Sequence, residues 1–208
     1  MKSKRVLIAH QSTIPHYRVP FYNALEKIRP EDWSFDVVFD KSELTSKRYF
    51  KEQISFDSFN FPILDVNTYS VKLGSTQLSY QNFLLKARLY DVIVVENAIN
   101  NIAYPLSQIY QLMGKKYVTW GHGKHRAIIN PGWFRQLSEL TKQKLTLLSS
   151  GFFAYTPGVK SYVESYGMPS AKVFSLNNTI DIQRQRTFFN KFFPDKSKIK
   201  SRMGLEKK

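Results

Sequence analysis

The chain has 208 residues, 42% of them hydrophobic, and a formal net charge of +15 at pH 7. This apolar content excludes a disordered chain, and the lack of cysteine excludes disulfide frameworks, cysteine-ligated metals and thiol catalysis. No apolar run approaches the roughly 20 residues of a membrane span, and none after the basic N-terminus is long enough for a secretion signal. We therefore expect a cytoplasmic protein of one large domain or two small ones.

The basic residues are unevenly distributed. Residues 1–100 contain 13 Lys or Arg and 11 Asp or Glu, whereas residues 101–208 contain 18 and 5. Two segments, 114–144 and 183–208, hold most of the excess. Such an asymmetry predicts a polyanionic partner: nucleic acid, an anionic membrane face or a phosphorylated small molecule. The alternative is a solvated basic face that maintains solubility.

Short apolar runs alternate with segments of helical periodicity along the chain. The apolar runs predict buried strands over residues 5–9, 35–39, 62–66, 91–96, 116–120, 152–155 and 172–176. The periodic segments predict helices over residues 19–28, 77–89, 102–113, 133–148 and 156–166, with a last helix that Asp181 would cap. Pro20 suits the first turn of its helix, and Gly114 suits the end of the helix before it.

This alternation predicts an α/β fold with a doubly wound, mostly parallel, Rossmann-like sheet and helices on both faces. We expect one such domain over residues 1–182, followed by a basic linker over residues 183–208. In these sheets, ligands bind outside the carboxyl ends of the strands, where the strand order reverses. Candidate site residues should therefore lie in the loops that follow the strands.

The first of these loops carries His16, Tyr17 and Arg18 at a predicted helix start. Free N–H groups and the helix dipole favour an anion there, and an arginine adds a bidentate donor. The loop contains no glycine, so the dinucleotide fingerprint is missing, and the chain has no Walker A sequence. We therefore predict substrate binding without a dinucleotide cofactor; a polar helix-capping loop is the alternative.

The segment after the strand at 116–120 reads Gly121-His122-Gly123, followed by Lys124 and Arg126. Glycines allow a ligand to approach the backbone closely, and histidine has an unperturbed pKa near neutrality. The two cations suit a phosphate or a carboxylate. We predict that His122 is catalytic and that its neighbours bind substrate; a structural histidine is the alternative.

Weaker candidates follow two other strands. Glu96 and Asn97 come after the strand at 91–96, where they would bind a polar substrate or form buried hydrogen bonds. Asn178 and Asp181 come after the last strand, where turn and capping chemistry is an equal alternative. None of the four histidines has the helical spacing of a zinc site, so we expect no metal. A G-x-S-x-G elbow is also missing, which disfavours an α/β-hydrolase.

Several segments resemble, in order and spacing, the amino-terminal domain of family 4 glycosyltransferases of the GT-B fold. They are Val6–Ala9, Ile14–Leu25, Asp91–Val95, Trp120–Gly123, Phe153–Thr156 and Lys172–Asp181. The resemblance covers essentially the whole chain. It implies two Rossmann-like domains facing a cleft, and transfer of a sugar from a nucleotide-sugar donor to a glycan or lipid-linked acceptor, with retention and without a metal. By this resemblance His122 lies close to the transferred sugar, and the first loop approaches the donor diphosphate.

The chain departs from the family pattern in three ways. The first loop lacks the adjacent glycines, and residues 178–181 read Asn-Thr-Ile-Asp instead of Asn-Gly-Val-Asp. The family's Glu-x₇-Glu donor motif belongs to the second domain and is missing here. We therefore expect half of an enzyme, inactive alone and completed by a missing or separate donor-binding domain. A non-catalytic partner subunit is the main alternative.

The helix predicted at 133–148 is basic and amphipathic. Such a helix suits an anionic membrane surface that presents a lipid-linked acceptor, and an ordinary sheet-covering helix is the alternative. The charge also suggests a nucleic-acid-binding protein, but no helix-turn-helix, RRM or zinc-finger pattern is visible. We therefore expect no nucleic-acid partner.

Overall fold

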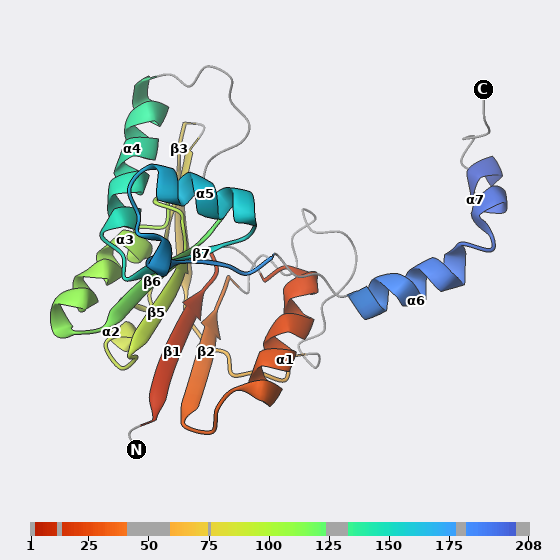
Figure 1. Ribbon diagram of the computed structural model, residues 1–208, viewed down its shortest axis with the longest axis horizontal. Helices are drawn as coiled ribbons and strands as arrows, with labels where there is room; N and C mark the ends of the chain where they lie inside the picture. Colours follow the sequence, from red (N-terminus) through yellow and green to blue (C-terminus); the bar gives the residue numbers. More distant parts are fainter. Residues whose placement is uncertain are drawn as a thin grey trace.

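The structure is a computed structural model that describes residues 3–11, 14–40, 59–74, 76–123, 133–177 and 182–202. Within these residues, six parallel strands form one sheet in the order β2-β1-β5-β6-β7-β8 (Figure 1). Their bounds are Lys4–Ala9 (β1), Trp33–Val38 (β2), Val92–Glu96 (β5), Lys116–Gly121 (β6), Gly151–Ala154 (β7) and Val173–Ser175 (β8). The predicted doubly wound, Rossmann-like α/β fold is confirmed.

The central strands are buried on both faces. In β5, Ile93 belongs to one core cluster and Val94 to the cluster on the opposite face. In β1, Leu7 and Ile8 divide in the same way, and Ile8 pairs with Val94 in the parallel register. Parallel strands covered on both sides are expected to be continuously apolar, which explains why the sequence pattern located these two correctly.

Helices cover both faces of the sheet. The bounds are Val19–Ile28 (α1), Leu84–Ala87 (α2), Ala103–Ser107 (α3), Trp133–Leu147 (α4) and Pro157–Ser165 (α5). Val19 and Tyr22 of α1 pack in the same cluster as Ile8, whereas Ala87 of α2 and Ala103 of α3 pack with Leu7 on the other face. The chain thus winds from β1 to β2 over one face and from β5 onwards over the other.

This winding places a reversal of strand order between β1 and β5. From β1 the chain moves outward to β2 and then returns to add β5 on the other side of β1. The loops that leave the carboxyl ends of β1 and β5 therefore diverge, and a crevice at such a point is the usual ligand position in doubly wound sheets.

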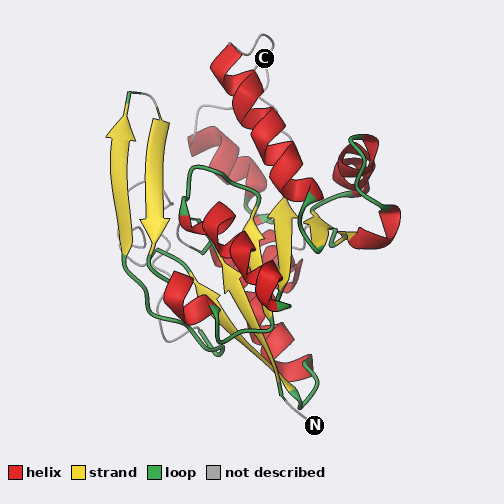
Figure 2. Cartoon of the chain, turned by 90° about the vertical axis from the view of Figure 1, so that its left-hand side faces the viewer, coloured by secondary structure: helices red, strands yellow, loops and turns green. Residues whose placement is uncertain are grey.

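The prediction of a helix over residues 77–89 is wrong. Strands Thr68–Leu73 (β3) and Thr76–Gln81 (β4) instead form an antiparallel hairpin, which stands apart from the main sheet in Figure 2. The apolar residues of β4, Leu78 and Tyr80, alternate with Ser79 and Gln81, and this period of two is that of a strand. A single helical turn, α2, follows the hairpin.

Two further predictions need correction. The strand predicted over residues 62–66 is a single parallel bridge between Ile63 and Val37, and Pro62 has no N–H with which to continue a ladder. The helix predicted over residues 102–113 is α3 followed by a 3-10 helix, Gln108–Met113 (η4). Gly114 ends this helix with a φ of 77°, as predicted.

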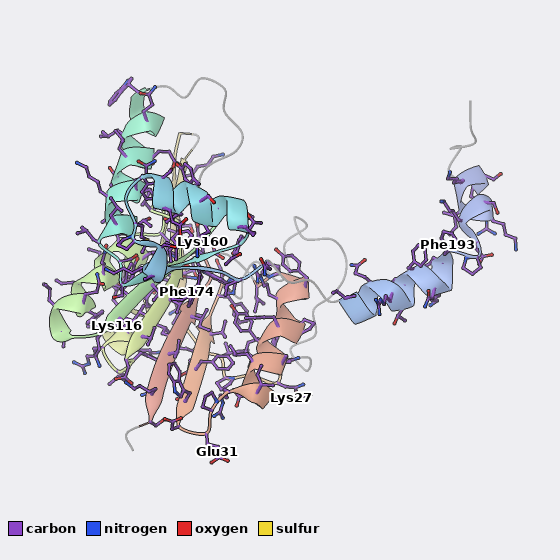
Figure 3. All side chains as sticks on the ribbon, viewed as in Figure 1. Lys27, Glu31, Lys116, Lys160, Phe174 and Phe193 are labelled. Carbon is purple, nitrogen blue, oxygen red and sulfur yellow. The ribbon has the colours of Figure 1, made fainter. Side chains whose placement is uncertain are left out.

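Two helices follow the sheet, Ile182–Phe192 (α6) and Lys196–Arg202 (α7). Figures 1 and 3 show them away from the sheet, with Phe193 labelled between them. Their described side chains are all exposed. The division into a domain over residues 1–182 and a linker over residues 183–208 stays a prediction.

Candidate functional site

Polar side chains gather around Tyr155 at the edge where β1, β5, β6 and β7 end. The His122 ring lies edge-on to Tyr155, with 4.5 Å between ring centroids. The Arg18 guanidinium lies 4.9 Å from the centre of the same ring. Burial, reinforced by the negative charge of Glu96 and offset by Arg18, raises the pKa of Tyr155, so this hydroxyl keeps its proton. Two predicted site residues, Arg18 and His122, thus lie against one aromatic ring, and the charge of a third, Glu96, acts on its hydroxyl.

Glu96, at the end of β5, is held by a histidine that the site prediction missed. His10 directly follows β1 and is 2% exposed. Its Nδ1 lies 3.0 Å from Glu96 Oε1, and its Nε2 lies 2.7 Å from the Tyr22 hydroxyl. A carboxylate only accepts hydrogen bonds, so Nδ1–H is the donor to Glu96. The signal available in the sequence was a histidine directly after a buried strand, the same signal that selected His122.

Arg18 belongs to the short 3-10 helix His16–Arg18 (η1) that precedes α1. It is 2% exposed, and its guanidinium also lies 5.2 Å from the Trp120 ring. Guanidinium groups at this distance from aromatic faces are stabilised by cation–π attraction. Arg18 is thus an interior cation of the cluster, and its direct contact with a bound anion stays a prediction.

Backbone conformation favours glycine on both sides of His122, and close packing also requires it at Gly123. Gly121 and Gly123 have φ values of 147° and 69°, a region that favours glycine. A Cβ on Gly123 would lie 3.0 Å from Tyr162 Cδ1 on α5. The chain therefore turns sharply against α5, and His122 is exposed at the rim, on the same edge as η1. This matches the arrangement expected from the sequence, while the catalytic role of His122 remains a prediction.

A small hollow lies next to Glu96, between the ends of β5 and β6 and the helix α4. Asn97, Thr119 and Thr146 are among its lining residues. The Asn97 Oδ1 accepts a 3.4 Å hydrogen bond from Thr146, whereas the buried Asn97 Nδ2 and Thr119 Oγ1 make none within the described part of the chain. Buried polar atoms are normally paired, so these two groups leave unused hydrogen-bonding capacity at the wall of the hollow.

The remaining predicted residues are placed only in part. His16 begins η1, and the Tyr17 ring lies 5.7 Å from the Arg18 guanidinium. Four candidates lie outside the described residues: Lys124, Arg126, Asn178 and Asp181. Among the residues that are described, no group of three or more His, Asp or Glu side chains is arranged to hold a metal ion.

Comparison with known proteins finds a likeness only at the level of three-dimensional structure. No family model matches the sequence, and no curated protein matches it. The structure of Anabaena Alr3699/HepE in complex with UDP-glucose superposes with a TM-score of 0.55 at 16% identity, covering 97% of this chain and 50% of that one. A Listeria monocytogenes protein assigned as a UDP-N-acetylglucosamine 2-epimerase gives 0.52 at 19% identity, with 84% and 45% covered.

A second UDP-N-acetylglucosamine 2-epimerase gives a TM-score of 0.50 at 15% identity, covering 84% of this chain and 48% of that one. The chain therefore spans about half the length of the solved structures that it matches. At identities this low, the structural similarity establishes the fold alone, which is that of one lobe of GT-B-type proteins.

Proposed function

We propose that this chain is the amino-terminal lobe of an enzyme that processes nucleotide sugars. The observation that carries the proposal is the cluster at the carboxyl ends of the strands, where Arg18 and the exposed His122 lie against half-buried Tyr155 and the charge of Glu96 acts on its hydroxyl. The proteins of the same fold are described with UDP and UDP-glucose or as UDP-sugar epimerases. Because the chain spans half of their length, a second lobe, in the same or a separate polypeptide, would complete the site.

The reaction that we favour is glycosyl transfer with retention, to a glycan or a lipid-linked acceptor. Negative charge would develop on the leaving diphosphate, so fixed N–H groups and cations aimed at it would supply the main catalytic effect. Exposed His122 would donate or accept a hydrogen bond with the sugar or the acceptor hydroxyl. A lipid-linked acceptor would place the chain at an anionic membrane surface on the cytoplasmic side.

Two alternatives remain as candidates. The likeness to two UDP-N-acetylglucosamine 2-epimerases favours epimerisation of a sugar nucleotide as the second candidate. The other alternative is that the chain is a non-catalytic subunit that supports a separate donor-binding chain.

The first test is a titration of the chain, combined with its second lobe, with UDP-glucose, UDP and inorganic phosphate, in which the NMR signals of the histidine rings are recorded. We expect the His122 signals to move with UDP-glucose, because that ring is exposed beside the proposed site. Variant His122→Ala should weaken UDP-glucose binding, whereas Gln77→Ala on the exposed hairpin should not. If all histidine signals stayed unchanged at saturating UDP-glucose, the proposal would be wrong for this lobe.

The second test separates the candidate reactions in the protein combined with its second lobe. Transfer releases UDP, whereas epimerisation changes the sugar without releasing it, and a non-catalytic subunit does neither. We expect His122→Ala to lower turnover by about 100-fold or more, a typical loss for a residue that moves or orients a reacting proton. Unchanged turnover would remove His122 from the catalytic site.

A further inference from the structure

His10 is a buried polar residue, and both nitrogens of its ring are engaged. It follows β1, which lies beside β5 in the sheet (Figure 1), and it is 2% exposed. Its Nδ1 lies 3.0 Å from Glu96 Oε1, and its Nε2 lies 2.7 Å from the Tyr22 hydroxyl. The Trp120 ring packs edge-on against the imidazole, with 4.8 Å between ring centroids. These contacts fix both the position and the rotation of the ring.

The two ends of this hydrogen-bonded chain differ in exposure. Tyr22 is fully buried, and its burial raises the pKa of the hydroxyl, which therefore keeps its proton. Glu96, in contrast, has 28% of its side chain exposed and lines the hollow beside Asn97. As far as the structure describes the chain, Glu96 Oε2 accepts no hydrogen bond. A hydrogen-bonded chain that served only the core would need no end outside it, so the open end points to a ligand.

The charge of Glu96 restricts which chemical group could bind there. A carboxylate only accepts hydrogen bonds, so the group must donate one, and a diphosphate would be repelled as a like charge. The sugar of a nucleotide sugar and the sugars of an acceptor glycan both offer neutral hydroxyl groups. Glu96 Oε2 is therefore suited to a sugar hydroxyl and not to the diphosphate.

We propose that His10 is a positioning residue: it holds Glu96 Oε1, so that Oε2 accepts a hydrogen bond from a hydroxyl of the sugar nucleotide or of the acceptor. This inference rests on the proposed function and adds to it a residue that the substrate does not touch. The His10 ring is buried and both of its nitrogens are engaged, so its effect must pass through Glu96. A displacement of about 1 Å at a reacting group can lower a rate by about 100-fold.

Two substitutions separate the two hydrogen bonds of His10. In His10→Asn, the short side-chain amide can place its nitrogen where Nδ1 lies and continue to donate to Glu96. In His10→Gln, the longer amide reaches the position of Nε2 and retains the partner of Tyr22. Each variant loses one hydrogen bond, so urea denaturation should show similar stabilities for the two.

The measurement is turnover and binding of UDP-glucose by the protein combined with its second lobe. We expect His10→Gln to lower kcat by about tenfold or more, and His10→Asn to retain most of the turnover of the parent. Binding of UDP alone should be unchanged in both variants, because UDP lacks the transferred sugar. If His10→Gln also weakens UDP-glucose binding, the hydroxyl belongs to the sugar nucleotide; if only turnover falls, it belongs to the acceptor.

A second comparison tests whether His10 acts through Glu96. In Glu96→Ala, no carboxylate remains to be positioned, so the further substitution His10→Gln should not lower turnover again. This non-additivity is expected of two residues that act as one unit. A loss of the same size in the parent and in Glu96→Ala would overturn the proposal.

The hydrogen on Nδ1 can be observed without any turnover. The ¹⁵N NMR signals of the His10 ring, assigned by their loss in His10→Asn, should show that Nδ1 carries a hydrogen. A ring with hydrogen on Nε2 alone would overturn the proposal, because Nδ1 could not then donate to Glu96.

The kinetic outcomes distinguish this inference from the function on which it rests. Equal losses of turnover in His10→Asn and His10→Gln, or no loss in either, would overturn the positioning role and leave the proposed function standing. A parent protein that neither binds nor turns over UDP-glucose would overturn the proposed function, and this inference with it.

Discussion

His10 Nδ1 and Glu96 Oε1 lie 3.0 Å apart, which joins the ends of two neighbouring strands, β1 and β5. Tyr22 fixes the other ring nitrogen, and burial raises the pKa of Tyr22, so its hydroxyl stays protonated. Among the described residues, Glu96, with 28% of its side chain exposed, is the end of this chain of hydrogen bonds that opens to solvent. The direction in which the carboxylate points is therefore set by a histidine that solvent does not reach.

The contrast between the two histidines of the site gives a first prediction. His10→Leu removes both hydrogen bonds and leaves the Tyr22 hydroxyl buried and unpaired, which should lower the free energy of unfolding by about 1–3 kcal/mol. His122→Leu, at the exposed rim, should change it by less than about 0.5 kcal/mol. Urea denaturation of both variants measures this, and equal losses would contradict the hydrogen-bonded role of His10.

Gly123 and Gly114 share a left-handed backbone and differ in their surroundings. Their φ values are 69° and 77°, but a Cβ on Gly123 would meet Tyr162, whereas one on Gly114 would meet nothing within 4 Å. Gly114→Ala should therefore cost only the backbone strain, about 1–2 kcal/mol. Gly123→Ala should add overpacking of about 1–3 kcal/mol. Thermal unfolding compares them, and equal losses would show that α5 moves freely away from the loop.

Gln81 links the hairpin to the site. Its Nε2 donates to the His10 carbonyl, and its Oε1 accepts from Asn101 Nδ2 and the Tyr104 hydroxyl. Gln81→Leu would leave these buried groups unpaired, and each unpaired group lowers the free energy of unfolding by about 1–3 kcal/mol. We therefore expect the free energy of unfolding to fall by more than about 3 kcal/mol. Gln77→Leu, exposed on the same strand, is the matched control for chemical denaturation, and a similar small loss in both would refute the link.

Alkaline pH should destabilise the fold through its buried tyrosines. Burial raises the pKa of Tyr22, Tyr104 and Tyr117 above the ordinary value of 10.0. Below about pH 10 these groups are neutral in both states, so stability does not depend on them. Above about pH 10 the unfolded chain loses protons that the folded chain keeps, and each tyrosine lowers stability by about 1.4 kcal/mol per pH unit.

Urea denaturation across alkaline pH, with tyrosine ionisation followed by absorbance, checks this. In Tyr22→Phe, the free energy of unfolding should decline less steeply with pH, by the contribution of one tyrosine. Tyr69→Phe removes a hydroxyl that is not buried, and it serves as the control. A stability that stayed constant above about pH 11 would contradict the raised pKa values.

Local sequence patterns were sufficient to predict most strands of the sheet. The β1 and β5 runs are apolar on both faces, and a parallel central strand needs that composition wherever it lies in the fold. The position of His122 was predictable for a similar reason: residues that follow parallel strands collect at one edge. Gly114 marked the end of its helix because few other residues adopt that backbone conformation easily.

The hairpin and the hydrogen-bonded cluster depended on contacts between distant residues. Leu78 and Tyr80 fit a helical stripe as well as a strand, and only pairing with β3 selects the strand. His10 and Glu96 are 86 residues apart, and Arg18 is buried because Trp120 and Tyr155 arrive from two other strands. Local patterning thus determined which segments form the sheet and which residues reach its edge. Burial and pairing, which depend on neighbours distant in sequence, determined which of those residues touch.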